Sequence, residues 1–354
     1  MNQAATAGQI RWVYAWLAST LLAALAFACV STQLSPTPGL IEITASSRVP
    51  VPGGHVNAAG GNFFHERVDL ALDTRLGPFA IGAVYNSAWG WTASVDATYK
   101  NGTLRDATGA SLPLAALANG AAAPGTHWVK LDATRVKTKG GLVHEFDAAT
   151  GRLIAIRYAS APYPRIRFGQ VQLGAAWRTN TVEQCESATL CTPVFTLAYD
   201  SNARLVRIDD RAGRSARFAY DAAGKLTSAR DGLDVAKGWP GERYAYSGNY
   251  LAAITRSEGE RVEIVSDAMG RATEVRAIGA GDPAWRFDYG VGNAAGVYTT
   301  RALDPLGNAS TYAIDAVLRT LSVTNALGER TEFSWSGMRP ASRTLADGTR
   351  TAWT

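Results

Sequence analysis

Carboxylates are the residues of this 354-residue chain that could most directly do chemistry, because two of them flanking a glycosidic bond can hydrolyse it. Asp209 and Asp210 are the one adjacent acidic pair in the sequence. Asp210 also opens a phrase, Asp-Arg-Ala-Gly, that ends at Gly213 and is typical of a tight turn. The acidic residues therefore have a structural explanation, and the sequence predicts no enzyme.

The histidines, serines and glycines show none of the spacings that metal, nucleophile or phosphate chemistry requires. No histidine lies in H-E-x-x-H, no serine lies in G-x-S-x-G, and the glycines around Gly60 do not form a phosphate-binding loop. We expect no catalytic residue, no cofactor and no metal site. The histidines, expected in loops or on strand faces, are His55, His65, His127 and His144.

Cys185 and Cys191 are the candidate disulfide. They lie close together in the sequence, and an oxidising compartment would allow them to pair. Two free thiols remain the alternative. We expect no metal at this pair, since no histidine lies within about twenty residues of it.

Residues 1–31 differ from the rest of the chain. Residues 12–30 carry no charge and follow Arg11, which is typical of a signal peptide or a signal anchor. An A-x-A pattern ending at Ala28 predicts cleavage before Cys29, while a retained anchor and lipidation of Cys29 remain open. We therefore expect an exported protein (periplasmic, secreted or at the cell surface) that meets a membrane only through this segment.

The composition favours a folded, turn-rich protein. Hydrophobic residues make up 47% of the chain and charged residues 18%, so a sizeable core is possible and disorder is not expected. The 35 glycines suit a chain with many turns. The net charge of +5 is scattered without a basic run, so we expect no nucleic-acid partner.

A recurring phrase indicates the elements that hold these residues in place. An aromatic residue and Asp precede two or three small residues, a Gly and then a basic residue, as in the copy from Tyr220 to Lys225. Asp accepts a backbone hydrogen bond in the turn, and Gly takes a positive φ. Each copy therefore predicts a hairpin between two short strands. The predicted turn and aromatic positions are Phe146, Asp147, Gly151, Tyr199, Asp200, Tyr220, Asp221, Gly224, Asp267, Gly270 and Asp315, with a weaker copy at Phe287 and Asp288.

A second turn alternates with the first. Asp304 and Gly307 bound one example, and Pro305 suits the second position of a type I turn. The unit of strand, turn, strand and turn repeats about every 20 to 27 residues, which is typical of repeat arrays. The sequence thus predicts an all-β fold: a hairpin array over 140–354 after a small β-rich head domain at 45–135, a linker at 32–44 and an N-terminal signal helix.

The head carries further motifs, among them Gly77–Phe79, Val84–Ser87 and Trp89–Thr92. Together with the array, they make the chain resemble the Rhs or YD-repeat family. The resemblance implies a spiral or shell-like sheet without catalytic activity. It also implies that a complete shell encloses a C-terminal effector domain, as in polymorphic toxins.

The array stops in the middle of a unit, so we expect the N-terminal portion of a longer or truncated family member. Its partners would be the C-terminal effector domain or the remaining repeats. The alternative function is a cell-surface carbohydrate-binding or adhesion module. Its candidate stacking platform comprises tryptophans such as Trp89, Trp91, Trp177, Trp285 and Trp335.

Overall fold

The computed structural model describes residues 47–74, 77–106, 111–123, 128–138, 140–279, 284–290, 292–337 and 339–353. These residues all belong to one compact unit, Gly39–Thr354. The predicted signal segment, its cleavage site at Ala28 and Cys29, and the linker at 32–44 lie outside the described residues. No helix in the described ranges is long and apolar enough to span a membrane.

The head segment forms two antiparallel sheets in which strands pair in sequence order. The first holds β1 (Arg48–Val51), β2 (Gly54–Asn57), β3 (Phe63–Thr74), β4 (Gly77–Asn86) and β5 (Gly90–Ala93). The second holds β6 (Thr98–Lys100), β7 (Thr103–Arg105) and β8 (Ser111–Pro113). The long β3 and β4 pair from Phe64 with Asn86 to Thr74 with Gly77.

The rest of the chain forms one large antiparallel sheet, in which each strand pairs with its neighbours in sequence. Its first strands are β9 (Val129–Lys130), β10 (Arg135–Lys137), β11 (Leu142–Phe146), β12 (Leu153–Tyr158), β13 (Ile166–Leu173), β14 (Ala176–Cys185), β15 (Cys191–Tyr199), β16 (Leu205–Asp210), β17 (Ser215–Tyr220) and β18 (Leu226–Arg230). It continues with β19 (Glu242–Ser247), β20 (Tyr250–Thr255), β21 (Arg261–Ser266), β22 (Ala272–Ile278), β23 (Ala284–Tyr289), β24 (Tyr298–Leu303), β25 (Ala309–Ile314), β26 (Thr320–Thr324), β27 (Arg330–Ser336), β28 (Arg339–Thr344) and β29 (Arg350–Ala352). One short helix, α2 (Gly232–Lys237), interrupts it and is capped by Asp231.

The repeated phrase marks a β-bulge as well as a turn. The register of β17 and β18 shifts between Ala219 and Tyr220, directly before the turn at Asp221. The pairs β15–β16, β19–β20 and β25–β26 shift at the same place in their own hairpins. An extra residue at this point is typical of a type I turn followed by a residue with positive φ.

The reading of Phe287 and Asp288 as a copy of the phrase is wrong. Both residues lie inside β23, where the pairing with β24 continues without a register shift, and the turn of this hairpin begins only at Asn293. The side chain of Asp288 is largely exposed and lies 3.9 Å from Arg301 on the paired strand. Tyr289 is the aromatic residue of this unit, because alternation along the strand places it on the same side as Phe287.

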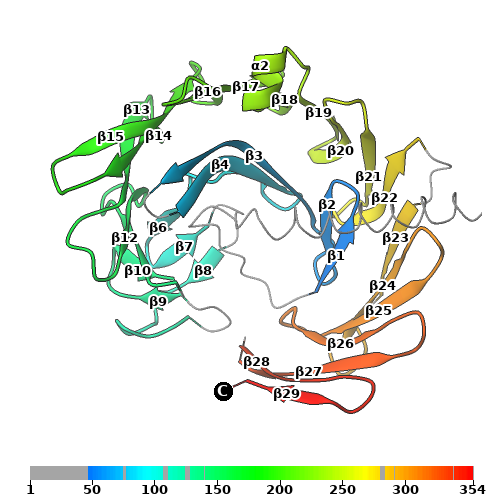
Figure 1. Ribbon diagram of the computed structural model, residues 1–354. Coiled ribbons are helices and arrows are strands. Elements are labelled where there is room, and N and C mark those ends of the chain that lie inside the picture. The colour runs from blue at the N-terminus through cyan, green and yellow to red at the C-terminus, as the bar shows by residue number, and fades with distance from the viewer. Residues whose placement is uncertain are drawn as a thin grey trace, which may run out of the picture. The chain divides into compact units, whose positions relative to one another are not determined.

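One hydrophobic core joins the head sheet to the large sheet, which curves around β3 and β4 (Figure 1). Phe79 on β4 lies 6.3 Å from Phe168 and 6.2 Å from Phe195, measured between ring centroids. Polar contacts join other strands: Thr300 Oγ1 donates to the carbonyl of Ala58 at 2.6 Å. The head thus supplies apolar surface that the array buries, as stacked repeats require.

Candidate functional site

The turn aspartates act as backbone acceptors. Asp200 Oδ1 accepts hydrogen bonds from the N–H groups of Asn202 and Arg204, each at 2.9 Å. At the next turn of this kind, Asp221 Oδ1 accepts from the N–H of Lys225 at 2.8 Å. The same acceptor role belongs to Asp147, Asp210, Asp267, Asp304 and Asp315. These carboxylates therefore hold turns, which leaves them poorly placed for catalysis.

The glycines supply the positive φ that the turn requires. Gly224 has φ of 84° and Gly270 has φ of 81°. Gly151 and Gly307 take the same region of φ. Two copies lack this glycine and place Ala203 and Leu318 in the left-handed region instead, at φ of 58° and 66°. Those two turns therefore carry backbone strain that the glycine copies avoid.

The basic residue after each turn binds back to its own aspartate. Arg204 Nε donates to Asp200 Oδ2 at 2.7 Å, and Arg271 makes the same 2.7 Å contact with Asp267. The Arg204 hydrogen bond lowers the pKa of Asp200 below its usual range. Arg319 and Asp315 repeat the pair near the end of the chain.

The same basic residue also covers the aromatic ring of the following unit. The guanidinium of Arg204 lies 4.9 Å from the centroid of the Tyr220 ring, and that of Arg271 lies 4.7 Å from Tyr289. The ammonium of Lys225 lies 5.3 Å from Tyr246. Each cation therefore joins two successive hairpins, since it binds a carboxylate or carbonyl group and a neighbouring ring.

The tyrosine hydroxyls add hydrogen bonds to backbone carbonyl groups of the preceding unit. Tyr220 donates to the carbonyl of Leu205 at 2.9 Å, and Tyr246 donates to that of Leu226 at 2.8 Å. Tyr199, Tyr289 and the indole of Trp335 make the equivalent bonds to Thr179, Ala272 and Thr320. Burial raises the pKa of Tyr220 to about 12, so its hydroxyl stays a donor at neutral pH. We call this series of cations and aromatic rings the ladder.

A buried polar network joins the head to the array. His65 on β3 places Nδ1 2.7 Å from the carbonyl of Gly53 and Nε2 2.9 Å from Glu242 Oε2 on β19. Arg67 contacts Asp69 at 3.1 Å. Burial raises the pKa of Asp69 to about 6 against the opposing effect of Arg67. Burial would also raise the pKa of Glu242, but His65, Tyr244 and Arg67 lower it to about 2.

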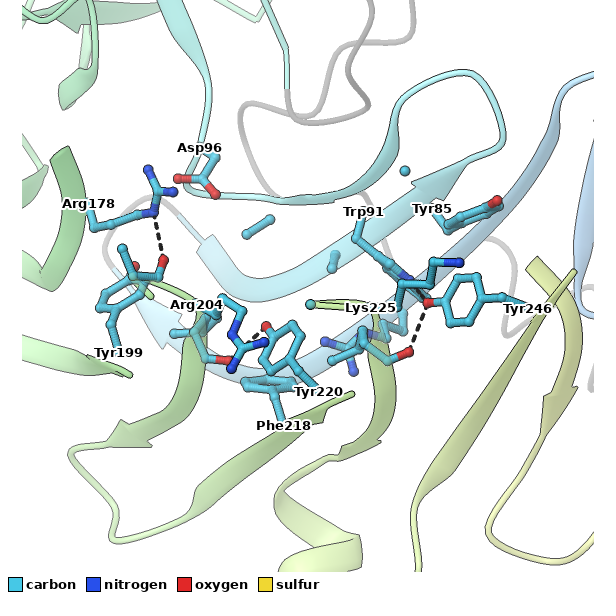
Figure 2. A pocket seen from close by; sticks show the side chains of 18 of the residues that line it. Tyr85, Trp91, Asp96, Arg178, Tyr199, Arg204, Phe218, Tyr220, Lys225 and Tyr246 are labelled. Carbon is cyan, nitrogen blue, oxygen red and sulfur yellow. Dashed lines mark hydrogen bonds between the residues drawn. The ribbon is translucent and has the colours of Figure 1, made fainter. Parts of the chain in front are cut away.

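A cleft of about 380 Å³ lies where the head meets the ladder (Figure 2). One side is formed by β4 and β5, including Trp91, and the other by ladder residues of three successive hairpins. Four basic side chains and one carboxylate line it: Arg67, Arg178, Arg204, Lys225 and Asp96. Trp91 Nε1 donates to the Tyr246 hydroxyl at 2.9 Å, which fixes the indole against the ladder.

A family model described as RHS Repeat matches residues 199–236, the segment in which Tyr199, Asp200, Tyr220 and Asp221 form two ladder units. The chain carries an RHS repeat. The resemblance inferred from the sequence is thus confirmed, and the RHS repeat corresponds here to a bulged hairpin with an Asp-anchored turn.

Solved structures share a limited likeness with this RHS-repeat chain. The structure titled "Crystal Structure of TcdB2-TccC3-Cdc42" aligns at 12% identity and a TM-score of 0.38, over 79% of this chain and 15% of that one. A Tc holotoxin pore from Photorhabdus luminescens with the mutation TccC3-D651A aligns at 12% identity and a TM-score of 0.39, over 75% and 15%. The chain thus spans about 15% of the length of these two proteins. Among curated proteins, no significant match is found.

The tryptophans of the RHS-repeat chain have separate roles. Trp91 lines the cleft and Trp335 belongs to the ladder. Trp89 is 54% exposed, and Arg105 lies 5.1 Å from its ring. Trp177 and Trp285 do not line the cleft.

The ring–cation contacts and the hydroxyl hydrogen bonds of the ladder were not foreseen from the sequence, which predicted only the turns and the positions of the aromatic residues. The preference for Tyr over Phe before the turns was an available signal, because only Tyr supplies a hydroxyl donor. Phe146, the early copy before Asp147 and Gly151, is buried and makes no such bond. Its ring instead packs 5.8 Å from Tyr99 in the head.

Cys185 and Cys191 form a disulfide at the loop end of the β14–β15 hairpin, where the two residues pair directly. No group of three or more His, Cys, Asp or Glu residues in the described ranges is arranged to hold a metal ion. His65 and His144, expected in loops or on strand faces, are buried at 3% and 1% exposure.

Proposed function

We propose that this chain is the scaffold portion of an exported RHS-type protein, similar to polymorphic toxins, without catalytic activity of its own. Its sheet would encapsulate or present a C-terminal effector domain or further repeats that are not in this chain. The ladder carries the proposal, because it gives the sheet a fixed connection from one hairpin to the next. Such a connection suits a wall, which must keep its curvature while its inner face contacts a cargo.

The turn chemistry and the core also support a scaffold. The aspartates of the repeated phrase accept hydrogen bonds from backbone N–H groups, so their structural role in the turns accounts for their presence in the sequence. The head packs into the same core as the array and braces the inner side of the sheet. In this arrangement, the effector would meet a preformed surface.

The test begins with the gene region that follows codon 354. We expect further repeats and a variable domain there. Co-expression of this chain with that downstream polypeptide should give a complex in which the variable domain resists protease, whereas the variable domain alone is digested. Equal digestion in both samples, or unrelated downstream sequence, would contradict encapsulation by this product.

A second candidate function is carbohydrate binding at the cell surface. The cleft favours it, because an indole, tyrosine rings and cations converge there on a space of ligand size. We expect binding on a glycan array that Trp91→Ala abolishes. Trp89→Ala is the matched control, since Trp89 lies outside the cleft. Absence of binding to any glycan would remove this function and leave the scaffold proposal intact.

A further inference from the structure

Several arginines of the large sheet face a carboxylate on the neighbouring strand. Arg167 on β13 pairs directly with Glu183 on β14, and their side chains approach to 2.8 Å. The same cross-strand arrangement recurs further along the sheet in the pairs Glu263 with Arg276, Glu274 with Arg286 and Asp288 with Arg301. Opposite charges in directly opposed positions stabilise a sheet, whereas like charges there destabilise it. An exception to this arrangement therefore calls for an explanation.

Strands β16 to β19 are that exception. Arg207 on β16 lies directly opposite Arg217 on β17, and Arg217 lies directly opposite Arg230 on β18. Arg243 on β19 follows diagonally, since it pairs with Ser228, two residues before Arg230. We call Arg207, Arg217, Arg230 and Arg243 the arginine row. Neighbouring strands lie about 4.8 Å apart, so the row places one arginine on each strand at about that interval.

The arginine row lies on the face of the sheet that is turned away from the head. Ile208 and Phe218, which alternate with the row along β16 and β17, are buried in the core. The guanidinium of Arg67 on β3 lies 4.8 Å from the centroid of the Phe218 ring, so this buried side faces the head (Figure 1). Successive residues of a strand point to opposite faces, so the row points outward. Accordingly, Arg217 and Arg243 are exposed.

Only the first member of the row has an acidic partner. Arg207 Nε lies 2.7 Å from Asp209 Oδ2 on the same strand. Among the residues that the structure describes, Arg217, Arg230 and Arg243 form no ion pair with a carboxylate. Three neighbouring cations thus keep their full charge on one face of the sheet, where they repel one another.

Arg230 also has hydrogen-bond donors that are not used. Its Nη2 atom donates to the carbonyl of Asp234 at 3.1 Å, whereas its Nε atom is buried and has no acceptor. The two carboxylates nearest to it in the sequence have other partners: Asp231 caps α2, and Asp234 accepts from Ser257 Oγ at 2.5 Å. The row therefore lacks counter-charges and hydrogen-bond acceptors, and an anionic ligand would supply both.

The spacing and the surroundings of the row favour a phosphate ligand. Guanidinium groups bind phosphate oxygens through paired N–H donors. In an extended acidic peptide, the side chains on one side recur about every 6.6 Å, out of step with strands about 4.8 Å apart, whereas a linear polyphosphate carries a charge on every unit. The outward residues beside the row include Ala219 on β17 and Ala245 on β19, which offer no ring on which a nucleobase could stack.

We propose that the arginine row binds a linear polyphosphate chain on the outward face of the sheet. Arg217 and Arg230 hold neighbouring phosphate groups, and Arg243 extends the contact to a further strand. The charges of the ligand remove the repulsion between the opposed arginines, so binding stabilises the folded sheet. The inference depends on neither the scaffold nor the carbohydrate candidate, because the cleft lies on the head side of the same strands.

The test measures binding of tripolyphosphate to the full chain by calorimetry at fixed ionic strength, with a pentaglutamate peptide and a thymidine pentanucleotide as reference probes. We expect tripolyphosphate to bind at least about tenfold more tightly than either reference probe. Arg217→Gln and Arg230→Gln should each weaken this binding about fivefold. Arg301→Gln is the matched control: it removes the same charge elsewhere on the sheet, where Asp288 opposes it, and should leave the affinity unchanged.

Three results would overturn the inference: no saturable binding of tripolyphosphate, binding of either reference probe as tightly as tripolyphosphate, or unchanged affinity in both row variants. Circular dichroism establishes that each variant is folded. The protease-protection and glycan experiments test the other two proposals independently.

A charge reversal gives a second readout that does not depend on calorimetry. Arg217→Glu converts both like-charge pairs into opposite-charge pairs of the kind found elsewhere in the sheet. The free variant should melt about 1 to 2 °C higher than the natural chain, and it should lose the further rise that tripolyphosphate gives the natural chain. A lower melting temperature of the free variant, or an equal rise with tripolyphosphate in both proteins, would contradict the proposal.

Discussion

The hydroxyl of Tyr220 donates a hydrogen bond to the backbone carbonyl of Leu205 at 2.9 Å, one turn upstream in the repeat. The same ring lies under the guanidinium of Arg204, the residue just before Leu205. One side chain thus binds both the backbone and the cation of the preceding turn. This relationship converts a row of hairpins into a connected wall.

Tyr220→Phe should destabilise the protein by about 1 kcal/mol, because the ring and its cation contact remain while the hydroxyl donor is lost. Denaturant unfolding measures the change. Tyr298→Phe is the control, since the Tyr298 ring is 45% exposed and is expected to change stability little. Equal stability of the two variants would show that the hydroxyl bond adds nothing to the wall.

Asp200→Asn should keep the turn but lose the pairing with Arg204. Asn325 occupies the corresponding position of another turn and accepts from Leu327 and Glu329 through Oδ1, so an amide supports this geometry. We expect a loss of less than about 1 kcal/mol at pH 7, because the pair is partly exposed. Asp200→Ala should cost more, since it also removes the turn acceptor.

Acid should destabilise the turns. The Arg204 hydrogen bond lowers the pKa of Asp200 in the folded state. As the pH falls, Asp200 is therefore protonated first in the unfolded chain, near the ordinary pKa of about 3.9. This contribution is present above pH 4 and is lost as the pH falls toward the folded pKa. Urea unfolding between pH 5 and pH 2 should show the loss, and Asp200→Asn should reduce it. An equal pH dependence in the variant would contradict the linkage.

Asp69 should act in the opposite direction. Burial raises the pKa of Asp69 in the folded state to about 6. Its contribution to the free energy of unfolding is therefore fully present below pH 4 and is lost as the pH rises through 6. Asp69→Asn should flatten the stability profile between pH 4 and pH 6 while lowering stability overall, because Arg67 loses its partner. Asp73→Asn, at an exposed position on the same strand, should keep the slope.

Leu318→Gly should stabilise the protein by about 0.5 to 1 kcal/mol. Leu318 has φ of 66° and is 53% exposed, so glycine relieves the backbone while little packing is lost. Leu327→Gly is the matched control: that residue is 84% exposed and precedes the turn glycine, so its substitution should be neutral or unfavourable. A lower melting temperature for Leu318→Gly would contradict the strain argument.

Reduction of the Cys185–Cys191 disulfide should lower stability by about 2 kcal/mol, because the short loop it closes gains entropy in the unfolded chain. Unfolding with and without a reducing agent measures this. The double variant Cys185→Ser and Cys191→Ser should be insensitive to the reducing agent. If the reducing agent destabilises the double variant as much as the natural chain, the loss of stability does not come from this disulfide.

The sequence alone determined the all-β fold and most of its turns. Asp221 and Gly224 could be read directly, because a type I turn with a positive-φ residue constrains residue type through local geometry alone. Phe287 and Asp288 were misread because Gly292 follows Asp288 at the spacing that Gly151 has from Asp147, whereas the turn of this hairpin runs from Asn293 to Gly296.

Only the tertiary structure decided the ladder and the cleft. Arg204 and Tyr220 lie 16 positions apart in the sequence, and their contact depends on the stacking of one hairpin on the next. Trp91 and Tyr246 are 155 positions apart in the sequence, and His65 and Glu242 are 177 positions apart. Each pair is in contact because the large sheet curves around the head. Turn chemistry is local and can be read from neighbouring residues, whereas a site built between layers depends on long-range packing.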